Sequence, residues 1–486
     1  MTWRPVTLAG WLWLLLVMPS TGSAYAQEAV EAKVAKLPQT ELQQEVVQML
    51  QGVDREVGID IGFRVEDLDG TVVADYHGDQ EMALASNTKL WTTSAALFAL
   101  GEDFHWRTRA FLEGDHLIVV GGGDPSLRTL PGNHAEDAFL DELAQTLKDS
   151  GTTELQKLSI DGSYFQANGP HPLWPKDQLS FEYTAPVSAL SVNGGMVELT
   201  WNAKASALHP AVGSAIRLRT VQKNGSSLAA WWKNAREIHI RSPRNGKESQ
   251  VAFTQRDPLQ FAGLWLQEGL RRRGIQVANL EFVEQAHQTT QAPILDWQSA
   301  WSLADVVVAC NKESDNYLAE VLLLTLGQEF RQEGSWEAGV EAIEQILSEA
   351  GLEDFVLKLA DGSGMARNWP EVMNVSRPQD ICQLLRLMAT KDQGRVFFDS
   401  LPIGGVDGSL KQRFRESVFQ PQRVHAKTGF IMRVSSLSGY VLDDEDRVLV
   451  FSFVVYFDRS KNKQTNNKRF RELRKDLLRL VLEAAS

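Results

Sequence analysis

The sequence predicts a mixed α/β protein whose main domain is interrupted by a large β-rich insertion. Three observations lead to this fold class. Residues 27–103 combine helix and strand patterns, residues 104–287 contain mostly short strand patterns, and residues 288–486 supply helices, three strands and a last helix. Because both ends of the chain carry strands and helices, we expect them to complete one sheet. We expect the insertion to form two subdomains.

The composition is that of a globular protein. The chain has 486 residues, 43% hydrophobic and 23% charged, with two cysteines and a formal net charge of −13. A chain of this length can bury a core large enough to fold without disulfides or a structural metal. The acidic charge argues against a general nucleic-acid binder, because phosphate contacts need a basic face.

The first 26 residues resemble a secretory signal peptide. Arg4 is their only charge, an apolar run extends over Leu8–Met18, and Ala24–Ala26 has the pattern of a signal peptidase site. An uncleaved anchor is the alternative, but the apolar run is well short of the ~20 residues that span a bilayer. We expect cleavage after Ala26, a periplasmic mature protein, and no transmembrane segment in it.

Helix and strand signals alternate at the start of the mature chain. Apolar residues at helical spacing predict a helix over Thr40–Leu50. Gly58–Glu66 and Thr71–Tyr76 read as strands around Asp69-Gly70, which is a hairpin signal. A second helix is predicted over Asn87–Leu100.

Residues 104–287 contain mostly short strand patterns and few helix patterns. Helices are predicted there only over Ala135–Lys148 and Leu259–Arg272. The predicted strands are Trp106–Leu112, Leu117–Val120, Leu158–Asp161, Val197–Trp201, Ile216–Val221, Ile238–Ile240 and Val251–Thr254.

The last 200 or so residues return to longer elements. The predicted helices are Ser302–Ala309, Asp315–Leu326, Trp336–Ala350, Pro378–Ala389 and Lys468–Ala484, and the predicted strands are Val424–Gly429, Val434–Leu442 and Val448–Phe457. Cys310 and Cys382 both lie in helix patterns, where a thiol packs as a small hydrophobe. A bridge between them and two free thiols both stay open, and no Cys-x-x-Cys supports redox chemistry.

Several common catalytic motifs are missing. The sequence has no His-Glu-x-x-His among nine histidines, no Gly-x-Ser-x-Gly and no Gly-x₄-Gly-Lys. A zincin, an α/β-hydrolase and a P-loop enzyme are therefore disfavoured, and we predict no metal and no cofactor.

Three short motifs follow one another along the chain: Ser86-x-x-Lys89, Ser314-Asp315-Asn316 and Lys427-Thr428-Gly429. Each is weak alone, since Ser-x-x-Lys also occurs at Ser460 and any of them can be a solvated loop or a helix cap. Their settings strengthen them. Lys89 follows Ser86 by one helical turn, so a lysine with a lowered pKa could take the serine's proton.

The other two motifs lie in similar settings. Ser314 opens a helix pattern, and Lys427-Thr428-Gly429 falls on a predicted strand. Gly429 would allow a ligand to approach that strand closely. This is the placement that a serine acyl-transfer site needs.

With these motifs in place, the chain resembles the class C low-molecular-mass penicillin-binding proteins, the D-alanyl-D-alanine carboxypeptidase/endopeptidase family also called peptidase family S13. The resemblance covers roughly residues 40–460, and the 228 residues from Ser86 to Ser314 fit the family's extra domains. Further blocks in the family's order are Gly121–Leu127, Asp161–Ser163, Ala185–Asn193, Asp361–Met365 and Leu401–Gly408.

The resemblance implies a penicillin-binding or serine β-lactamase-like transpeptidase domain, an antiparallel sheet flanked by helices. It implies a serine D,D-peptidase that cleaves D-Ala-D-Ala termini or D-amino-acid cross-links of peptidoglycan in the cell wall. The implied partners are peptidoglycan stem peptides and β-lactam antibiotics, and a homo-oligomer stays open.

The resemblance also implies roles at the three motifs. Ser86 would be the nucleophile and Lys89 its general base. Ser314 and Lys427 would relay a proton to the leaving amine, and Asn316 would hold the stem's amide.

Five further residues would bind substrate. Thr428 would take the terminal carboxylate, beside Gly429, and the N–H groups of Ser86 and Phe430 would form the oxyanion hole. Asp161 and Arg367 match family positions near the stem's diamino-acid side chain. Equally, Asp161 could simply end a strand and Arg367 could be a surface cation.

Two positions depart from the family's pattern. Leu84 stands where the family usually has proline, and Phe430 stands where it usually has serine or threonine. The second change removes a hydroxyl near the substrate carboxylate, which leaves the preference between carboxypeptidase and endopeptidase open. The alternatives are a β-lactamase or D-amino-acid esterase on this scaffold, and a non-catalytic peptidoglycan-binding homologue. Class A β-lactamases deacylate with a glutamate in a Glu-x-x-Leu-Asn motif, and the nearest candidate here, Glu371–Asn374, has the wrong spacing.

Overall fold

The computed structural model confirms a mixed α/β fold with antiparallel sheets and helices, and two sheets in the middle of the chain also contain parallel strand pairs. It describes residues 39–130, 133–244, 246–283, 286–367, 374–444, 447–458, 460–461 and 466–485. The expected signal peptide, residues 1–26, lies outside the described residues. Within them, no helix has both the length and the apolar character to cross a membrane.

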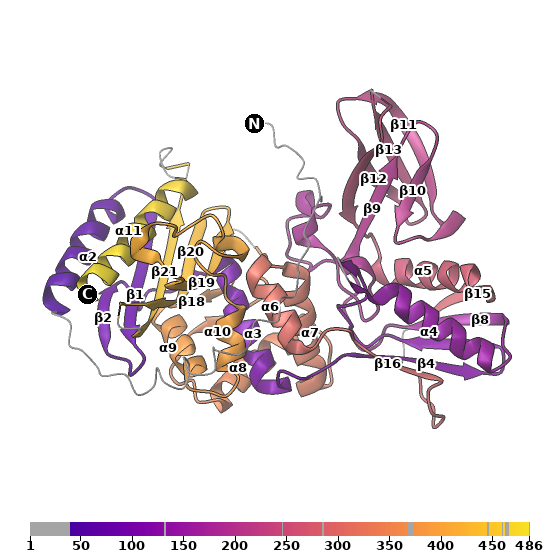
Figure 1. Ribbon diagram of the computed structural model, residues 1–486, viewed down its shortest axis with the longest axis horizontal. Coiled ribbons are helices and arrows are strands. Elements are labelled where there is room, and N and C mark those ends of the chain that lie inside the picture. Colours follow the sequence, from indigo (N-terminus) through magenta and orange to yellow (C-terminus); the bar gives the residue numbers. More distant parts are fainter. Residues whose placement is uncertain are drawn as a thin grey trace.

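Strands from both ends of the chain form one five-stranded antiparallel sheet (Figure 1). In spatial order the strands are β19 (Val424–Ile431), β20 (Val434–Leu442), β21 (Val448–Phe457), β1 (Ile59–Asp67) and β2 (Val72–Tyr76). The hairpin signal of the N-terminal region is thus β1 and β2, and the last three predicted strands complete the same sheet.

Both faces of this sheet are covered, because side chains of its central strand, β21, lie in two different apolar cores. On β21, Phe451 and Phe453 contribute to one apolar core, and Val450 and Val454 contribute to the other. Successive side chains of a strand point to opposite faces, so apolar residues at every position require a cover on each side. The cover of the first face is α2 (Gln39–Asp54) and α11 (Asn467–Ala485).

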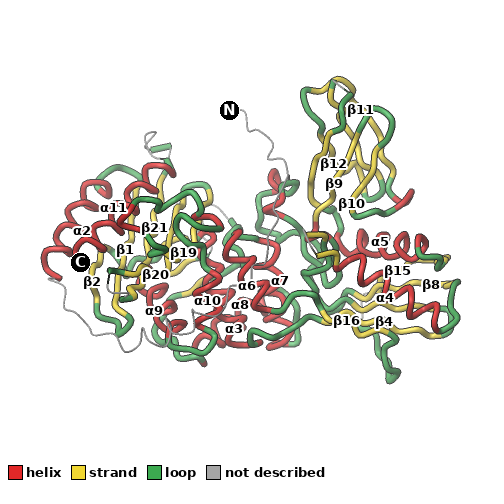
Figure 2. Tube along the Cα trace, in the orientation of Figure 1, coloured by secondary structure: helices red, strands yellow, loops and turns green. Residues whose placement is uncertain are grey.

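A group of helices covers the second face and extends from it toward the middle of the molecule (Figure 2). Its members are α3 (Thr88–Leu100), α6 (Leu303–Glu313), α7 (Asn316–Arg331), α8 (Trp336–Glu349), α9 (Pro378–Ala389) and α10 (Gly394–Ser400). Beside them lies a small sheet of β17 (Leu357–Lys358), β18 (Val375–Ser376) and β3 (Met82–Ala83).

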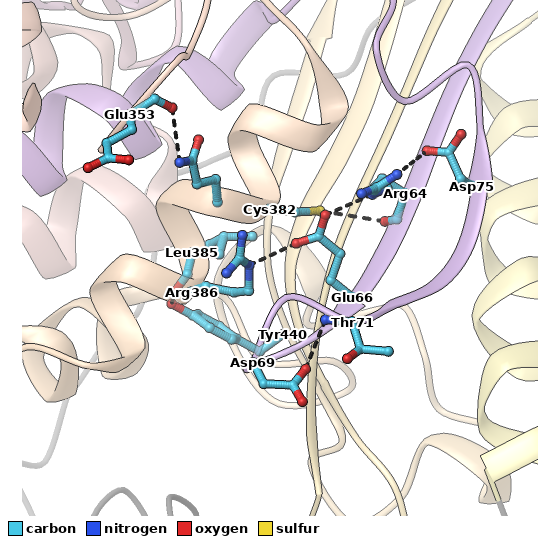
Figure 3. A network of polar contacts seen from close by, with 11 residues as sticks. Arg64, Glu66, Asp69, Thr71, Asp75, Glu353, Cys382, Leu385, Arg386 and Tyr440 are labelled. Carbon is cyan, nitrogen blue, oxygen red and sulfur yellow. Dashed lines mark hydrogen bonds and ion pairs between the residues drawn. The ribbon is translucent and has the colours of Figure 1, made fainter. Parts of the chain in front are cut away.

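A polar network ties α9 to the sheet (Figure 3). The buried Glu66 accepts from Arg64 Nε at 2.7 Å and from Arg386 Nε at 2.8 Å, so one carboxylate joins β1 to α9. Cys382 Sγ donates to the Arg64 carbonyl at 3.7 Å. Both this thiol and that of Cys310 are free and buried, which answers the question left open by the sequence.

The middle of the chain forms a second body with its own core. Its largest sheet has the order β15 (Gln276–Val283), β8 (Glu154–Asp161), β5 (His116–Val120), β4 (Arg107–Glu113) and β16 (Leu295–Gln298). Helices α4 (Ala135–Asp149) and α5 (Pro258–Arg272) pack on the same core. The short strands β6 (Thr129–Leu130) and β7 (Asn133–His134) precede α4.

Two three-stranded sheets lie apart from the sheet β15-β8-β5-β4-β16, at the end of the molecule away from β19-β20-β21 (Figure 1). They consist of β10 (Ser206–His209), β9 (Met196–Trp201) and β14 (Ser249–Thr254), and of β11 (Arg217–Gly225), β13 (Glu237–Pro243) and β12 (Ala229–Asn234).

The pairing of β16 bears on the extent of the insertion. This strand follows residue 287, yet it pairs with β4 in the insertion's sheet, with Leu295 opposite Ala110. We therefore propose that the insertion ends after β16 rather than at residue 287.

Candidate active site

Ser86 lies in a tightly held turn that leads into α3. The turn is a single 3₁₀ helix, η2 (Ala85–Asn87), and Ala85 has a left-handed backbone with φ of 48°. Two hydrogen bonds fix the residue before it: Leu84 N–H donates to the Asn374 carbonyl at 2.9 Å, and the Leu84 carbonyl accepts from Ser436 Oγ at 2.9 Å. Strand β20 and the 374 loop therefore hold Ser86 in place.

Lys89 is completely buried beneath Ser86. Its Nζ donates to Ser86 Oγ at 3.2 Å, to Asn316 Oδ1 at 2.6 Å and to the Ser363 carbonyl at 3.0 Å. Burial lowers the pKa of Lys89 from its ordinary value, more than the nearby acidic groups raise it. The arrangement places a lysine amine of lowered pKa next to a serine hydroxyl.

Lys427 and Ser314 form a second lysine–serine pair in the same cluster. Lys427 Nζ donates to Ser314 Oγ at 2.8 Å and to the Thr428 carbonyl at 3.0 Å. Burial and, after it, the charge of Lys89 place the pKa of Lys427 well below its ordinary value. Two buried ammonium groups close together disfavour each other's protonation.

Ser314 occupies a bend between two helices, so the expectation that it opens a helix is wrong. It ends α6 with φ of 60°, in the left-handed region. Asp315 instead caps α7, accepting from the Leu318 N–H at 3.1 Å, and α7 begins at Asn316. A carboxylate is a strong helix N-cap, which leaves the Ser314 hydroxyl available to Lys427.

Asn316 links the cluster to the insertion. Its Oδ1 accepts from Lys89, and its Nδ2 donates to the Tyr183 carbonyl at 2.7 Å. Tyr183 belongs to the loop between β8 and β9. The insertion therefore forms part of the wall of this site, a role that the three motifs do not reveal.

Strand β19 passes close to Ser86 because Gly429 has no side chain. A Cβ at Gly429 would lie 2.1 Å from Ser436 Oγ, 2.9 Å from the Leu84 carbonyl oxygen and 3.1 Å from Ser86 N. Any larger residue would push the strand away from the turn that carries Ser86. The next residue, Phe430, is 54% exposed, so its ring is not packed into the core.

Thr428 has a partner that the sequence did not reveal. Its Oγ1 donates to Ser409 Oγ at 2.9 Å, and Ser409 directly follows the Leu401–Gly408 block. The block that resembles the family ends at Gly408 and so leaves out Ser409. Only the position of that block beside β19 brings this second hydroxyl to the site.

Arg367 and Asp161 occupy different surroundings. Arg367 is half-buried and its N–H donates to the Leu173 carbonyl at 3.0 Å, in the same loop that supplies Tyr183. Burial lowers the pKa of Arg367, while Tyr183 acts in the opposite direction. The side chain of Asp161 instead accepts from the N–H groups of Ser163, at 2.8 Å, and His287, at 2.6 Å. Ser163 and His287 both lie within the insertion or at its edge.

Two buried carboxyl groups organise the loop above Lys89. Asp361 accepts from Trp174 Nε1 at 2.8 Å and from the N–H groups of Gly364 and Met365 at 2.7 and 3.0 Å. Glu320 accepts from the Gly362 N–H at 3.1 Å, and burial raises its pKa. Glu320 is four residues after Asn316 on α7, and that i, i+4 spacing was the signal by which it could have been found.

Residues 42–474 match the D-Ala-D-Ala carboxypeptidase 3 (S13) family. The chain belongs to this family. The resemblance found in the sequence is therefore confirmed, and the protein is a D-Ala-D-Ala carboxypeptidase-type serine hydrolase.

Individual relatives agree with the family. This chain is 28% identical to D-alanyl-D-alanine carboxypeptidase of Actinomadura sp. strain R39. The match extends over 480 residues and covers 90% of this chain and 85% of the relative. The fold matches penicillin-binding protein 4 of Haemophilus influenzae complexed with a novel β-lactam, with a TM-score of 0.69 and 20% identity over 90% of this chain and 99% of that one. A predatory endopeptidase of Bdellovibrio bacteriovorus matches with a TM-score of 0.51 and 14% identity, over 87% and 93%.

Proposed function

We propose that Ser86 is the nucleophile of a D,D-peptidase that acts on peptidoglycan stems, and that Lys89 is its general base. The observation that carries the proposal is the complete burial of Lys89 beside Ser86 Oγ. A lysine can act as a base near neutral pH only when its pKa is lowered, and burial has that effect here.

The acylation step uses the groups of this cluster in turn. Ser86 Oγ attacks the carbonyl between the last two D-alanines while Lys89 takes its proton. The Ser86 and Phe430 N–H groups stabilise the oxyanion, and such donors typically lower the activation barrier by ~3–4 kcal/mol. The bond to the leaving amine breaks as that amine receives a proton through Ser314 and Lys427. Water then hydrolyses the acyl-enzyme and regenerates the serine.

The substrate is held by groups on three sides of Ser86. We assign the terminal carboxylate to Thr428 and Ser409, whose hydroxyls lie together beside β19. Asn316 holds the stem's amide, and Gly429 allows the peptide to lie against the strand. For the stem's diamino-acid side chain we favour Arg367 over Asp161, because the Asp161 carboxylate is already taken by Ser163 and His287.

Export to the periplasm and endopeptidase cleavage of cross-links belong to the same proposal. A signal peptide over residues 1–26 would deliver the enzyme to the compartment that holds its substrate. Cross-linked stems present the same D-amino-acid carbonyl with a larger leaving group.

Labelled penicillin tests the proposal, because the drug mimics the D-Ala-D-Ala carbonyl and leaves a slowly hydrolysed acyl-enzyme. We expect one label per chain, on Ser86, and none in Ser86→Ala. Full labelling of Ser86→Ala would overturn the nucleophile assignment. Rapid turnover of the drug by the wild-type enzyme, with loss of turnover in Ser86→Ala, would instead indicate a β-lactamase. The matched control is Ser460→Ala, which changes the other Ser-x-x-Lys serine.

A further inference from the structure

The far end of the insertion carries a charge opposite to that of the rest of the protein. Residues 196–254, from β9 to β14, contain nine lysines and arginines against three glutamates, a formal net charge of +6. The whole chain has a net charge of −13, so the other residues together carry −19. A local excess of this size produces a positive potential at one end of the molecule.

Part of this charge lies on one exposed sheet face. In the sheet β11-β13-β12, Arg219 is the register partner of His239, and His239 is the partner of Trp231. Register partners point to the same side, so these three side chains form a row across the sheet. The opposite face carries Ile238 and Ile240, which are buried.

Two members of the row are open to solvent, whereas the His239 side chain is 17% exposed and its Nε2 lies 2.8 Å from Glu237 Oε1. The Arg219 side chain is 67% exposed and its carboxylate partner, on Glu237, is 4.0 Å away. Trp231 is 41% exposed and meets the His239 ring edge-on, with centroids 6.1 Å apart. Arg217 is exposed two residues before Arg219, on the same face of β11.

A crevice beside the sheet adds three more cations. Its volume is about 590 Å³, and it opens between the β9–β10 turn and β11. Lys204, Lys223 and Arg244 line it together with Trp201. All three cations are exposed, and none forms an ion pair within 4.0 Å among the residues that the structure describes.

We propose that this basic face, defined as Arg217, Arg219, Trp231 and His239 with the adjoining Lys204–Lys223–Arg244 crevice, binds the peptidoglycan polymer outside the catalytic site. The chemistry matches on two counts. Stem peptides end in carboxylates, which arginine and lysine bind, and sugar rings present an apolar side on which tryptophan packs. An anionic membrane fits less well, because insertion needs a broader apolar surface than Trp231 and Val221 supply.

The position of the basic face suits an accessory role. It lies at the opposite end of the molecule from the sheet β19-β20-β21 (Figure 1). It would therefore hold a different segment of the same polymer while the catalytic site works on a stem, which raises the effective concentration of stems. This inference rests on the proposed function, since it takes peptidoglycan as the substrate.

Sedimentation with purified, insoluble peptidoglycan tests the inference. The enzyme is first acylated with penicillin, so that its catalytic site is blocked. We expect the acylated wild-type chain to bind at low salt and to release at 0.5 M salt. The double variant Arg219→Glu/Trp231→Ala should bind at least ~10-fold more weakly. The matched control is Arg395→Glu/Phe330→Ala, which makes the same changes at exposed positions of α10 and α7 and should bind like wild type.

Activity separates binding from folding. The basic-face variant should cleave a soluble D-Ala-D-Ala peptide at the wild-type rate and should cleave whole peptidoglycan several-fold more slowly. Equal sedimentation of the basic-face and control variants would overturn the inference. The inference would also fail if the basic-face substitutions weakened binding to vesicles of anionic phospholipid and left binding to peptidoglycan unchanged. If penicillin does not acylate the chain, the proposed function fails, and the unmodified variants still show whether the basic face binds.

Discussion

We assign cations two different roles in two regions of this protein. At the catalytic cluster, Lys89 and Lys427 are completely buried, and burial lowers both pKa values. On the basic face, Arg217 and Arg219 are exposed to water. Burial suits the two lysines to the proposed proton transfer, whereas the two exposed arginines, which stay charged in proteins, suit the proposed binding of anions.

The two regions also differ in how the chain assembles them. The catalytic cluster joins α3, the α6–α7 bend and β19, which are more than 100 residues apart in sequence. The basic face comes from one continuous stretch of the chain, residues 204–244. A distributed cluster depends on the packing of the whole domain, whereas a local one survives small changes elsewhere.

The largest effect is expected from Lys89→Arg. Arginine keeps the charge but cannot deprotonate in a protein, so the acylation rate should fall by ~10²–10⁴-fold. The second-order rate of labelling by penicillin measures it. The control is Lys391→Arg, at an exposed position. A Lys89→Arg rate within about tenfold of wild type would exclude Lys89 as the base.

Gly429→Ala should follow, with a drop of ~10–10³-fold in the same labelling rate. The added Cβ would lie 2.1 Å from Ser436 Oγ, so β19 must move away from Ser86 and displace the Phe430 N–H from the oxyanion. Gly52→Ala is the control, since a Cβ there has no atom within 4 Å. If Gly429→Ala acylates as fast as wild type, the close approach of β19 does not matter to the reaction.

The stability of the protein should depend on pH through Lys89. With its pKa lowered in the folded state, the unfolded chain binds one more proton between that lowered pKa and ~10.5. The free energy of unfolding should therefore rise with pH in this window, by at most ~1.4 kcal/mol per pH unit from this group.

Lys89→Met removes that contribution. The difference in unfolding free energy between wild type and variant, from chemical denaturation at pH 6 to 9, should increase with pH. A difference that stays constant over this range would mean that Lys89 keeps its proton in the folded enzyme.

The smallest expected effect concerns Phe430. Phe430→Thr would restore a hydroxyl beside Thr428, and one hydrogen bond to a carboxylate contributes ~1.5–3 kcal/mol when well formed. Because this position is 54% exposed, we expect about a tenfold rise in kcat/KM on a D-Ala-D-Ala pentapeptide and a smaller rise on cross-linked muropeptide. Parallel assays of both substrates measure the ratio, and an unchanged ratio would show that Phe430 does not select the leaving group.

Much of the fold could be predicted from the sequence, because its signals are local. The nearly continuous apolar run of Val448–Phe457 and the apolar spacing in Pro378–Ala389 predicted β21 and α9. Strand β12 was missed, since Ala229–Asn234 has no clear alternation and is a strand only through its pairing with β13. The pairing of β16 with β4 was equally invisible, because four residues carry too little pattern.

By itself, the sequence determined the family, the three motifs and the one-turn spacing that brings Lys89 to Ser86. The tertiary structure alone decided that Lys89 is fully buried, that Tyr183 of the insertion contacts Asn316, and that Ser409 joins Thr428. The physical reason is the distance along the chain over which the interactions act. Spacing along one helix or strand follows from backbone geometry, whereas burial and contacts between distant segments arise only when all the elements pack together.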